Sequence, residues 1–304
     1  MDRARRATLR TLGGVAAALA MRRARSQPPA LVARQIPATG ELLPVIGLGT
    51  WQVFDVGSDT AMRAPLRQTL ERFARSGGRV VDSSAMYGTS ESVVGDLTAE
   101  LGVRKQLFLA TKVWTSGRDE GIRQMERSFL RLRVKRMDLM QVHNLLDVGT
   151  HTRTLAEWKR RGRVRYIGIT HYVRSAHAEV ERLLKGNGYD FLQINYSIGE
   201  PESAERLLPL AAERGVAVIA NRPFAEGAMF RRVRGKPLPE WAQEIGVASW
   251  AQYFLKWILG HPAVTCAIPG TGRPEHMADN LAAGVGPFPG AAMRKRMAQH
   301  FDTL

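Results

Sequence analysis

The 304-residue sequence contains one cysteine, no long apolar run and relatively few acidic residues. Cys266 alone cannot form an intramolecular disulfide, and it cannot supply a cysteine-built zinc site. No apolar run reaches the roughly 18 to 20 residues that a membrane-spanning helix needs. Hydrophobic residues make up 44% of the chain, which is enough for a sizeable core and excludes disordered or collagen-like classes. The composition therefore indicates a globular domain of enzyme size.

The shortage of acidic residues leaves a formal net charge of +16. A basic surface favours anionic ligands and weak association with polyanions. Nucleic-acid binding would require basic residues clustered on one face, with aromatic side chains or a groove-reading element between them. The densest basic runs, residues 131–136 and 159–165, lie at expected helix ends, where cations complement the helix dipole. We therefore expect no nucleic-acid partner.

Residues 1–26 have the pattern of an export signal. An Arg-Arg-x-x-Leu-Arg run at residues 5–10 precedes a short apolar stretch at residues 12–21. That stretch is too short for a membrane anchor and is typical of a cleaved signal peptide. The arginine run resembles the twin-arginine export motif, which implies export of the folded protein by the twin-arginine machinery to the periplasm or cell exterior, with no stable membrane anchor after cleavage. Cleavage after residue 20 or 26 is possible, and a basic tail or a misassigned start codon is the alternative.

After a linker and N-terminal segment at residues 27–43, short β-rich runs alternate with amphipathic helical patterns. The expected strands are residues 45–48, 79–82, 107–111, 137–142, 164–169, 191–194, 216–220 and 265–268. Strands of this kind, alternating with helices, indicate a parallel sheet covered by helices. Eight such units in about 250 residues predict a single α/β domain at residues 44–304, a (β/α)8 TIM barrel.

An open, doubly wound sheet is the competing fold. It would normally carry a G-x-G-x-x-G motif between its first strand and helix. The first strand here ends with Gly47 and Gly49, lacks the third glycine and opens no obvious helix. The pattern therefore favours the barrel.

Four ionisable side chains lie at the expected carboxyl ends of neighbouring strands, where such barrels build their active sites. Asp82, Lys112 and His143 end the second, third and fourth strands, and Tyr87 follows in the second loop. A cation such as Lys112, held by Asp82, would lower the pKa of Tyr87 from about 10 and make it a better acid. His143 could polarise a carbonyl oxygen. Side chains cannot donate hydride, so this chemistry implies a nicotinamide cofactor.

The contexts of these four residues resemble the catalytic tetrad of the aldo-keto reductases. The resemblance covers residues 44–283 and includes Asp82-x4-Tyr87, Lys112 in Ala-Thr-Lys-Val and His143 in Asp-Leu-Met-Gln-Val-His. It implies a (β/α)8 barrel that reduces aldehydes and ketones with NAD(P)H. Tyr87 would be the general acid, tuned by Lys112 and Asp82, while His143 would orient the carbonyl.

The resemblance also implies a cofactor site made from strand ends and the turn after the last strand. Its residues would be Thr50, Trp51, Thr170, His171, Gln193, Asn221, Arg222, Pro223, Phe224, Gly270, Thr271, Gly272, Arg273, His276 and Asn280. The turn beginning at Gly270 opens a helix, so its backbone amides suit a phosphate on physical grounds as well.

The sequence departs from the family pattern at positions that affect cofactor choice. Gly270 and His276 replace a Lys and an Arg that often hold the 2′-phosphate of NADPH, although Arg273 or Arg222 could take over that contact. We therefore expect NADPH as the cofactor, with NADH possible.

The substrate is expected to be a small-molecule carbonyl compound. Trp51, Trp114 and Tyr172 are candidates for the pocket wall, and aromatic residues at strand ends can equally serve packing. Residues 223–246 form a long insertion, which is typical of a lid or binding loop. The sequence does not identify the substrate.

Two other functions are compatible with a barrel. One is a non-catalytic, nicotinamide-binding redox-sensing or regulatory module, against which the intact tetrad argues. The other is a metal-dependent hydrolase with His143, His171 and Asp82 as ligands. No compact ligand set is apparent in the sequence, and Lys112 would be repelled by a metal, so we expect no metal site.

Overall fold

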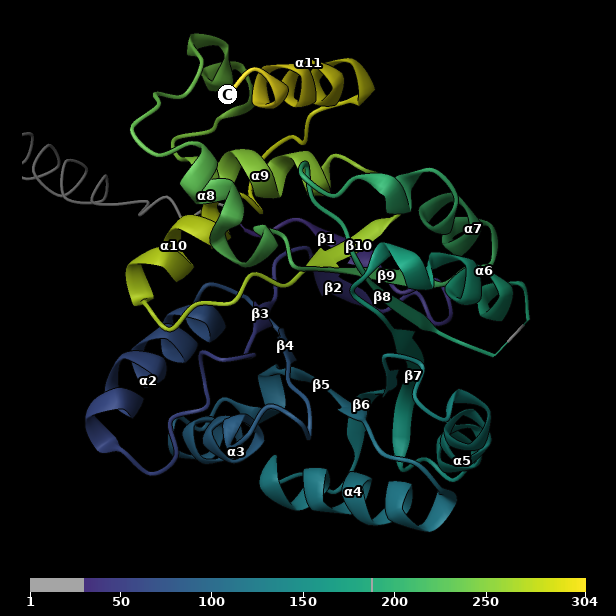
Figure 1. Cartoon of the computed structure of the whole chain (residues 1–304). Helices are drawn as coiled ribbons and strands as arrows, with labels where there is room; N and C mark the ends of the chain where they lie inside the picture. Colours follow the sequence, from purple (N-terminus) through teal and green to yellow (C-terminus); the bar gives the residue numbers. More distant parts are fainter. Residues whose placement is uncertain (1–29, 187) are drawn as a thin grey trace, which may run out of the picture. The chain divides into compact units, whose positions relative to one another are not determined.

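A computed structural model describes residues 30–186 and 188–304, and it contains eight parallel strands ordered consecutively in one sheet. The export signal predicted at residues 1–26 lies outside the described residues. The strands are β3 (Leu48–Gly49), β4 (Val80–Asp82), β5 (Phe108–Val113), β6 (Met137–His143), β7 (Val164–Thr170), β8 (Phe191–Asn195), β9 (Ala217–Asn221) and β10 (Val264–Ala267). Helices surround this sheet on its outer side (Figure 1).

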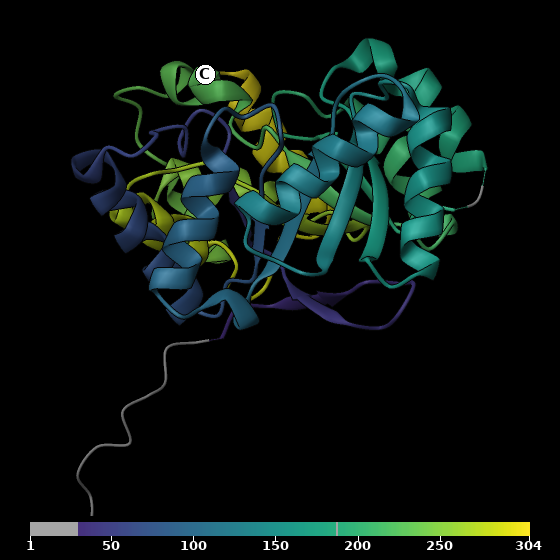
Figure 2. The ribbon, with the colours of Figure 1, turned by 90° about the horizontal axis from the view of Figure 1, so that it is seen from below.

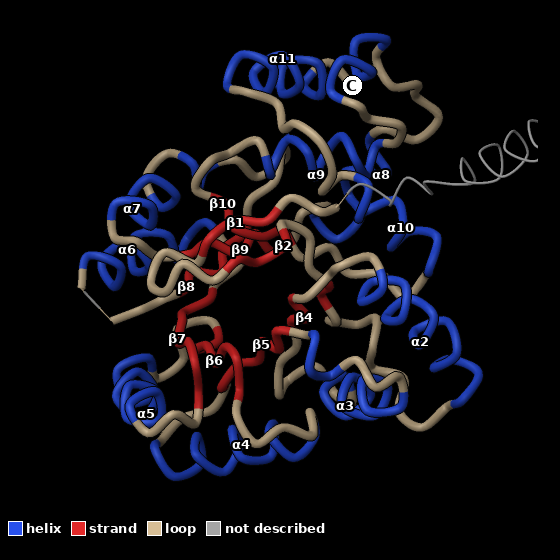
Figure 3. The backbone as a smooth tube through the Cα atoms, turned by 180° about the vertical axis from the view of Figure 1, so that it is seen from behind, coloured by secondary structure: helices blue, strands red, loops and turns tan. Residues whose placement is uncertain are grey.

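The sheet closes between its first and last strands. The amide of Gly47 donates to the carbonyl of Ala267 at 2.8 Å, and the amide of Ala267 donates to the carbonyl of Val45 at 2.9 Å. A β-carbon on Gly49 would lie 2.9 Å from the carbonyl oxygen of Ile268, so the close approach of the two chains requires glycine there. The predicted TIM barrel is confirmed, and Figure 3 shows its strands inside the ring of helices.

The helices follow the expected alternation, with two differences. They are α2 (Thr60–Arg75), α3 (Ser90–Glu100), α4 (Arg118–Arg131), α5 (Val148–Arg160), α6 (His177–Lys185), α7 (Leu207–Glu213), α8 (Ala228–Arg232), α9 (Trp250–Leu259), α10 (Pro274–Ala282) and α11 (Ala291–Asp302). The amphipathic pattern in the sequence predicts a helix at residues 155–161, but α5 begins seven residues earlier, because its first turn contains Gly149 and Thr150, whose low helix propensity hides the start. The insertion at residues 223–246 is not an open loop: it contains α8 and 3-10 turns at Ala225–Gly227 and Glu240–Ile245.

Apolar side chains form two separate cores. The smaller core fills the barrel interior and includes Phe108, Tyr166 and Phe191, whose rings pack within 6 Å of one another. The larger core lies between the strands and the helices. The strands are therefore buried on both faces, which explains their nearly continuous apolar sequences.

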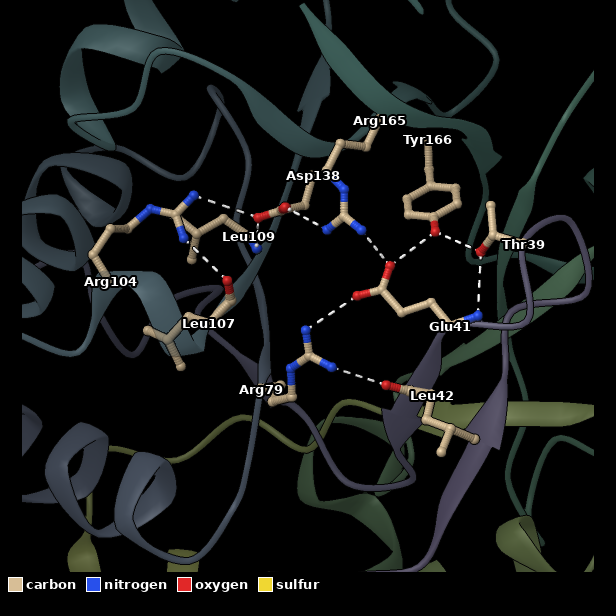
Figure 4. Close-up of polar contacts among 10 residues, drawn as sticks. All are labelled: Thr39, Glu41, Leu42, Arg79, Arg104, Leu107, Leu109, Asp138, Arg165 and Tyr166. Carbon is tan, nitrogen blue, oxygen red and sulfur yellow. Dashed lines mark hydrogen bonds and ion pairs between the residues drawn. The ribbon is translucent and has the colours of Figure 1, made fainter. Parts of the chain in front are cut away.

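A hairpin covers the amino-terminal end of the barrel strands. Strands β1 (Ala33–Gln35) and β2 (Leu42–Pro44) pair antiparallel, and Figure 2 shows them across that end. Glu41, at the start of the second hairpin strand, accepts from Arg79 at 3.1 Å and from the hydroxyl of Tyr166 at 2.9 Å, and it also contacts Arg165 (Figure 4). These contacts tie the hairpin to β4 and β7.

Asp138 extends this network to the next strands. One of its oxygens accepts from Arg165 at 2.9 Å, and the other accepts from the amide of Leu109 at 2.8 Å and from Arg104 at 3.4 Å (Figure 4). Both carboxylates of the network therefore have partners on each oxygen.

Among the described residues, no helix is long and apolar enough to cross a membrane.

Candidate active site

A cavity of about 500 Å³ opens at the carboxyl ends of the strands, opposite the hairpin. Thirteen of the candidate residues line it: Thr50, Trp51, Asp82, Tyr87, His143, Thr170, Tyr172, Gln193, Asn221, Arg222, Pro223, Phe224 and Gly270. Lys112 lies buried beneath this group, and Trp114, His171, Thr271, Gly272, Arg273, His276 and Asn280 do not line the cavity itself. The barrel thus gathers the four tetrad candidates at one end.

Lys112 and Asp82 form a buried ion pair at the base of the cavity. The ammonium of Lys112 donates to Asp82 Oδ2 at 2.7 Å and to the carbonyl oxygen of Ser83 at 2.6 Å. Burial alone would lower the pKa of Lys112, but Asp82 and Tyr87 outweigh it and raise that pKa above its ordinary value. Lys112 therefore keeps its charge at neutral pH.

Tyr87 lies directly above this pair. The ammonium nitrogen of Lys112 is 5.0 Å from the centroid of the Tyr87 ring. Burial raises the pKa of the Tyr87 phenol above 10, and the opposing effect of Lys112 only partly offsets it. The expected lowering is wrong in net direction, because the sequence could not weigh burial against the cation. Tyr87 consequently holds its proton at neutral pH.

His143 forms a second wall of the cavity. Its ring packs edge-on against Tyr87, with centroids 5.8 Å apart, and its Nδ1 lies 3.0 Å from the hydroxyl oxygen of Ser84. Burial, together with the charge of Lys112, lowers the pKa of His143 to about 2. The imidazole is therefore neutral over the whole physiological range.

Two amide side chains adjoin the buried pair. The amide nitrogen of Gln193 donates to Asp82 Oδ2 at 3.2 Å, while its oxygen accepts from Gln141 at 2.7 Å. Gln193 thus supports Asp82, a contact that sequence reasoning did not anticipate. Asn221 donates to the carbonyl of His171 at 3.1 Å, and its buried side-chain oxygen has no partner among the described residues. That oxygen can accept a hydrogen bond from a ligand.

The turn after β10 has the expected form. Pro274 is the first residue of α10, and Thr271 accepts from the amide of Arg273 at 3.1 Å. The exposed guanidinium of Arg273 pairs with Glu275 at 2.7 Å, His276 is exposed, and Asn280 is buried on the same helix. The amides of this helix start suit a phosphate, and the arginine is accessible to one.

The loop after β9 is held in an unusual backbone conformation. Arg222, Ala225 and Glu226 have φ angles of 49°, 47° and 52°, a backbone region that residues other than glycine rarely adopt. Arg222 contacts Glu226 and lies 3.5 Å from Glu200. Neither acidic residue was a candidate from the sequence. This loop places Arg222 at the cavity with its charge already paired.

Two of the three aromatic residues expected in the pocket wall lie there. Trp51 and Tyr172 line the cavity and are 43% and 44% exposed. Trp114 does not line it, although its ring centroid is 6.4 Å from that of His143. Met86 and Phe230 also line it and were not predicted, because nothing in their local sequence indicates that they lie at the cavity.

The described residues contain no group of three or more His, Cys, Asp or Glu side chains that could hold a metal ion. His143 contacts Ser84 and Tyr87, and the charge of Lys112 adjoins it. The arrangement suits proton transfer to an oxygen atom beside a neutral hydrogen-bond donor.

Comparison with known proteins identifies the class. The sequence profile described as "Aldo/keto reductase family" matches residues 45–295, most of the chain, so this protein belongs to that family and is an NAD(P)H-dependent oxidoreductase. It is 28% identical over 258 residues to methylglyoxal reductase YeaE of Escherichia coli, covering 82% of this chain and 88% of that one. It is 29% identical over 251 residues to an aldo-keto reductase of Mycobacterium sp. strain JLS, covering 80% and 84%.

Solved structures agree on the fold. An aldo-keto reductase from Klebsiella pneumoniae in complex with NADPH superposes with a TM-score of 0.73 at 24% identity, covering 90% of this chain and 96% of that chain. A second structure from the same organism, bound to NADP and acetate, has a TM-score of 0.72, also at 24% identity, and covers 86% and 93%.

Proposed function

We propose that this protein reduces an aldehyde or ketone to an alcohol, with NADPH as the hydride donor. The observation that carries the proposal is the buried Asp82–Lys112 pair beneath Tyr87, with neutral His143 on the adjoining wall of the same cavity. This group can place one hydrogen-bond donor and one acid at a single oxygen atom.

The residues present fit a nicotinamide dinucleotide. The unpartnered oxygen of Asn221 can accept from an amide group, and the start of α10 offers backbone amides to a phosphate. Gln193, Thr170 and Trp51 line the same cavity as Asn221. When bound, the cofactor supplies hydride to the carbonyl carbon.

Two side chains would act on the carbonyl oxygen, and two more would support the proton donor. His143 donates a hydrogen bond to it, which favours the negative charge that develops there. Tyr87 transfers its phenolic proton to the same oxygen and becomes a phenolate, which later regains a proton from solvent. Lys112 lies 5.0 Å from the Tyr87 ring and lowers the energy of that phenolate, while Asp82 fixes the position of the ammonium group.

Arg273 and Arg222 are the proposed contacts for the 2′-phosphate that distinguishes NADPH from NADH. Both guanidinium groups pair with glutamates, Arg273 with Glu275 and Arg222 with Glu226. A phosphate would replace a carboxylate partner with a more highly charged one, to which a guanidinium can donate two hydrogen bonds. Arg273 is the stronger candidate because it lies at the start of α10 and is 66% exposed.

The test is NADPH consumption by the purified full-length chain with a panel of carbonyl compounds. Methylglyoxal comes first, because a relative is named as its reductase, followed by aliphatic and aromatic aldehydes. Binding is followed in parallel through quenching of tryptophan fluorescence, since Trp51 lines the cavity. Saturable NADPH binding with turnover supports the proposal. Binding without any turnover would favour a regulatory module, and no binding would contradict the cofactor assignment.

We also propose that residues 1–26 direct the folded protein out of the cytoplasm by the twin-arginine route. Support comes from the sequence pattern at residues 5–21. Because that route exports folded proteins, the cofactor would leave with the enzyme. Replacing Arg5 and Arg6 by lysine should retain the protein in the cytoplasm. Equal export of this variant, or cofactor-free protein released by gentle periplasmic lysis, would count against the respective part of this proposal.

A further inference from the structure

We propose that Ser84 is a positioning residue that fixes the tautomer of His143, so that Nε2 carries the proton offered to the substrate carbonyl. The inference rests on the proposed function for its catalytic consequence, but its structural part stands on contacts of this chain alone. Ser84 is fully buried in the loop after β4, and its hydroxyl oxygen lies 3.0 Å from His143 Nδ1.

The protonation state of His143 makes its tautomer matter. Burial and the Lys112 charge hold the pKa of His143 at about 2, so the ring is neutral and has one N–H donor and one acceptor nitrogen. Nδ1 faces Ser84, and Nε2 makes no hydrogen bond within the described part of the chain although His143 lines the cavity. Nε2 is therefore the nitrogen available to a substrate. It can donate only if Nδ1 is the acceptor.

The contacts of Ser84 favour that arrangement. Its hydroxyl oxygen already accepts from the amide of Met86 at 3.4 Å, and among the described residues His143 Nδ1 is the one acceptor within hydrogen-bond distance of the hydroxyl proton. In the opposite tautomer, Nδ1–H would donate to Ser84, and the Nε2 lone pair would face the carbonyl oxygen of the substrate. Two acceptors would then oppose each other, which costs free energy in the transition state.

The same residue also connects His143 to the proposed acid. The carbonyl oxygen of Ser84 accepts from the amide of Tyr87 at 3.0 Å, which closes the turn that carries the phenol. Ser84 thus holds His143 with its side chain and Tyr87 with its backbone. A side-chain substitution separates the two roles, because it leaves the backbone contact in place.

The direct test is nitrogen NMR of the full-length chain labelled with ¹⁵N-histidine, alone and as Ser84→Ala. We expect wild-type His143 to show a protonated Nε2 and an unprotonated Nδ1 between pH 6 and 8. Ser84→Ala should show a mixture of the two tautomers. A wild-type spectrum with protonated Nδ1, or an Ser84→Ala spectrum identical to wild type, would overturn the inference.

Steady-state kinetics distinguish a positioning role of Ser84 from general structural support. Ser84→Ala should lower kcat about five- to tenfold with little change in KM, because the lost hydrogen bond affects an interaction that strengthens in the transition state. Ser84→Thr restores the hydroxyl and should recover most of kcat and the single tautomer. A larger rise in KM than fall in kcat would contradict the assigned role.

Ser83 offers a matched control. Its side-chain oxygen is also buried but has no hydrogen-bond partner within the described residues, so Ser83→Ala removes a neighbouring hydroxyl without removing such a contact. It should leave the His143 tautomer unchanged and affect kcat less than Ser84→Ala. An equal change in tautomer or kcat would overturn the specific role of Ser84. If the tautomers are as expected but no variant turns over a carbonyl, the positioning inference stands and the proposed function fails.

Discussion

The two ends of the barrel differ in how far their side-chain oxygens are hydrogen-bonded within the chain. At the amino-terminal end, both oxygens of Glu41 and both oxygens of Asp138 have partners (Figure 4). At the carboxyl end, Asp82, Asn144 and Asn221 each keep a buried side-chain oxygen without a partner among the described residues. At the first end the carboxylates are satisfied within the chain, and the buried atom without a partner in the described part of the chain is a donor, Nε of Arg104. The second end instead retains unpaired acceptors, which a ligand can use.

Backbone conformation follows the same division. Eight described residues other than glycine have positive φ angles, and seven of them lie in the loops after β3, β6 and β9 at the carboxyl end: Gln52, Asn144, Leu145, Asp147, Arg222, Ala225 and Glu226. Such conformations cost free energy and tend to persist at functional sites. The comparison indicates that one end of this barrel stabilises the fold while the other is organised around a ligand.

Lys112→Met should disrupt the carboxyl end of the barrel more than any other single substitution considered. It should lower kcat at least 100-fold, because Tyr87 loses the cation that stabilises its phenolate. It should also lower the free energy of unfolding by about 3–5 kcal/mol, because Asp82 is left buried without its counter-charge. Kinetics and urea unfolding measure the two effects.

A second variant separates the effects of Lys112→Met. Adding Asp82→Asn removes the unpaired charge, so stability should largely recover while activity remains lost. Recovery of activity in the double variant would show that the ion pair serves the fold alone, and the contrast between the two ends would disappear.

The next effect concerns cofactor choice at the carboxyl end. Arg273→Ala should raise KM for NADPH about tenfold and leave KM for NADH unchanged, because a charge-assisted hydrogen bond to the 2′-phosphate is lost. Steady-state kinetics with each cofactor measure this. An equal change for both would mean that Arg273 does not read the 2′-phosphate.

Glu41→Gln tests the amino-terminal end. It should cost about 1 kcal/mol of stability, since its partners are partly exposed to solvent, and leave kcat unchanged. A reduction of kcat comparable to that of Lys112→Met would show that the two ends are not functionally separate.

The pH dependence of stability provides a check on Glu41. Burial opposes the charge of Glu41, but Tyr166 and the adjacent arginines outweigh it and hold its pKa below the ordinary value. A depressed folded pKa gives stability that is present above the unfolded pKa of about 4.3 and is lost as pH falls through the folded value. The stability difference between wild type and Glu41→Gln should therefore shrink below about pH 4. A difference that grows with acid would contradict this.

The smallest expected effect is the absence of a titration. Because His143 has a pKa of about 2, it should contribute no acid limb to kcat/KM between pH 5 and 7. A limb with an apparent pKa near 6.5 that disappears in His143→Gln would show that the imidazole titrates in the working range.

The sequence was sufficient for the barrel and for the positions of its main candidates, for a physical reason. Asp82, Lys112 and His143 each end an apolar strand, and parallel strands bring such ends to one rim. Local periodicity and the closed sheet together determine that placement. Tyr87 could be placed at the same rim because it lies in the short loop that follows β4.

Contacts that depend on side-chain packing could not be predicted from the sequence. The Ser84–His143 hydrogen bond and the Gln193–Asp82 contact join residues 59 and 111 positions apart, and no local pattern encodes either of them. The only signal that the sequence offered for Ser84 is a serine just beyond an expected strand end. The pKa of Tyr87 was misjudged for a related reason, since its direction depends on how deeply the phenol is buried.

The most direct test of the account is the activity of Tyr87→Phe beside wild type, with NADPH binding measured on both. The substitution removes one oxygen and retains the ring that packs against His143. We expect unchanged NADPH binding and a loss of carbonyl reduction of at least 100-fold. Reduction that survives in Tyr87→Phe would contradict the assignment of Tyr87 as the proton donor.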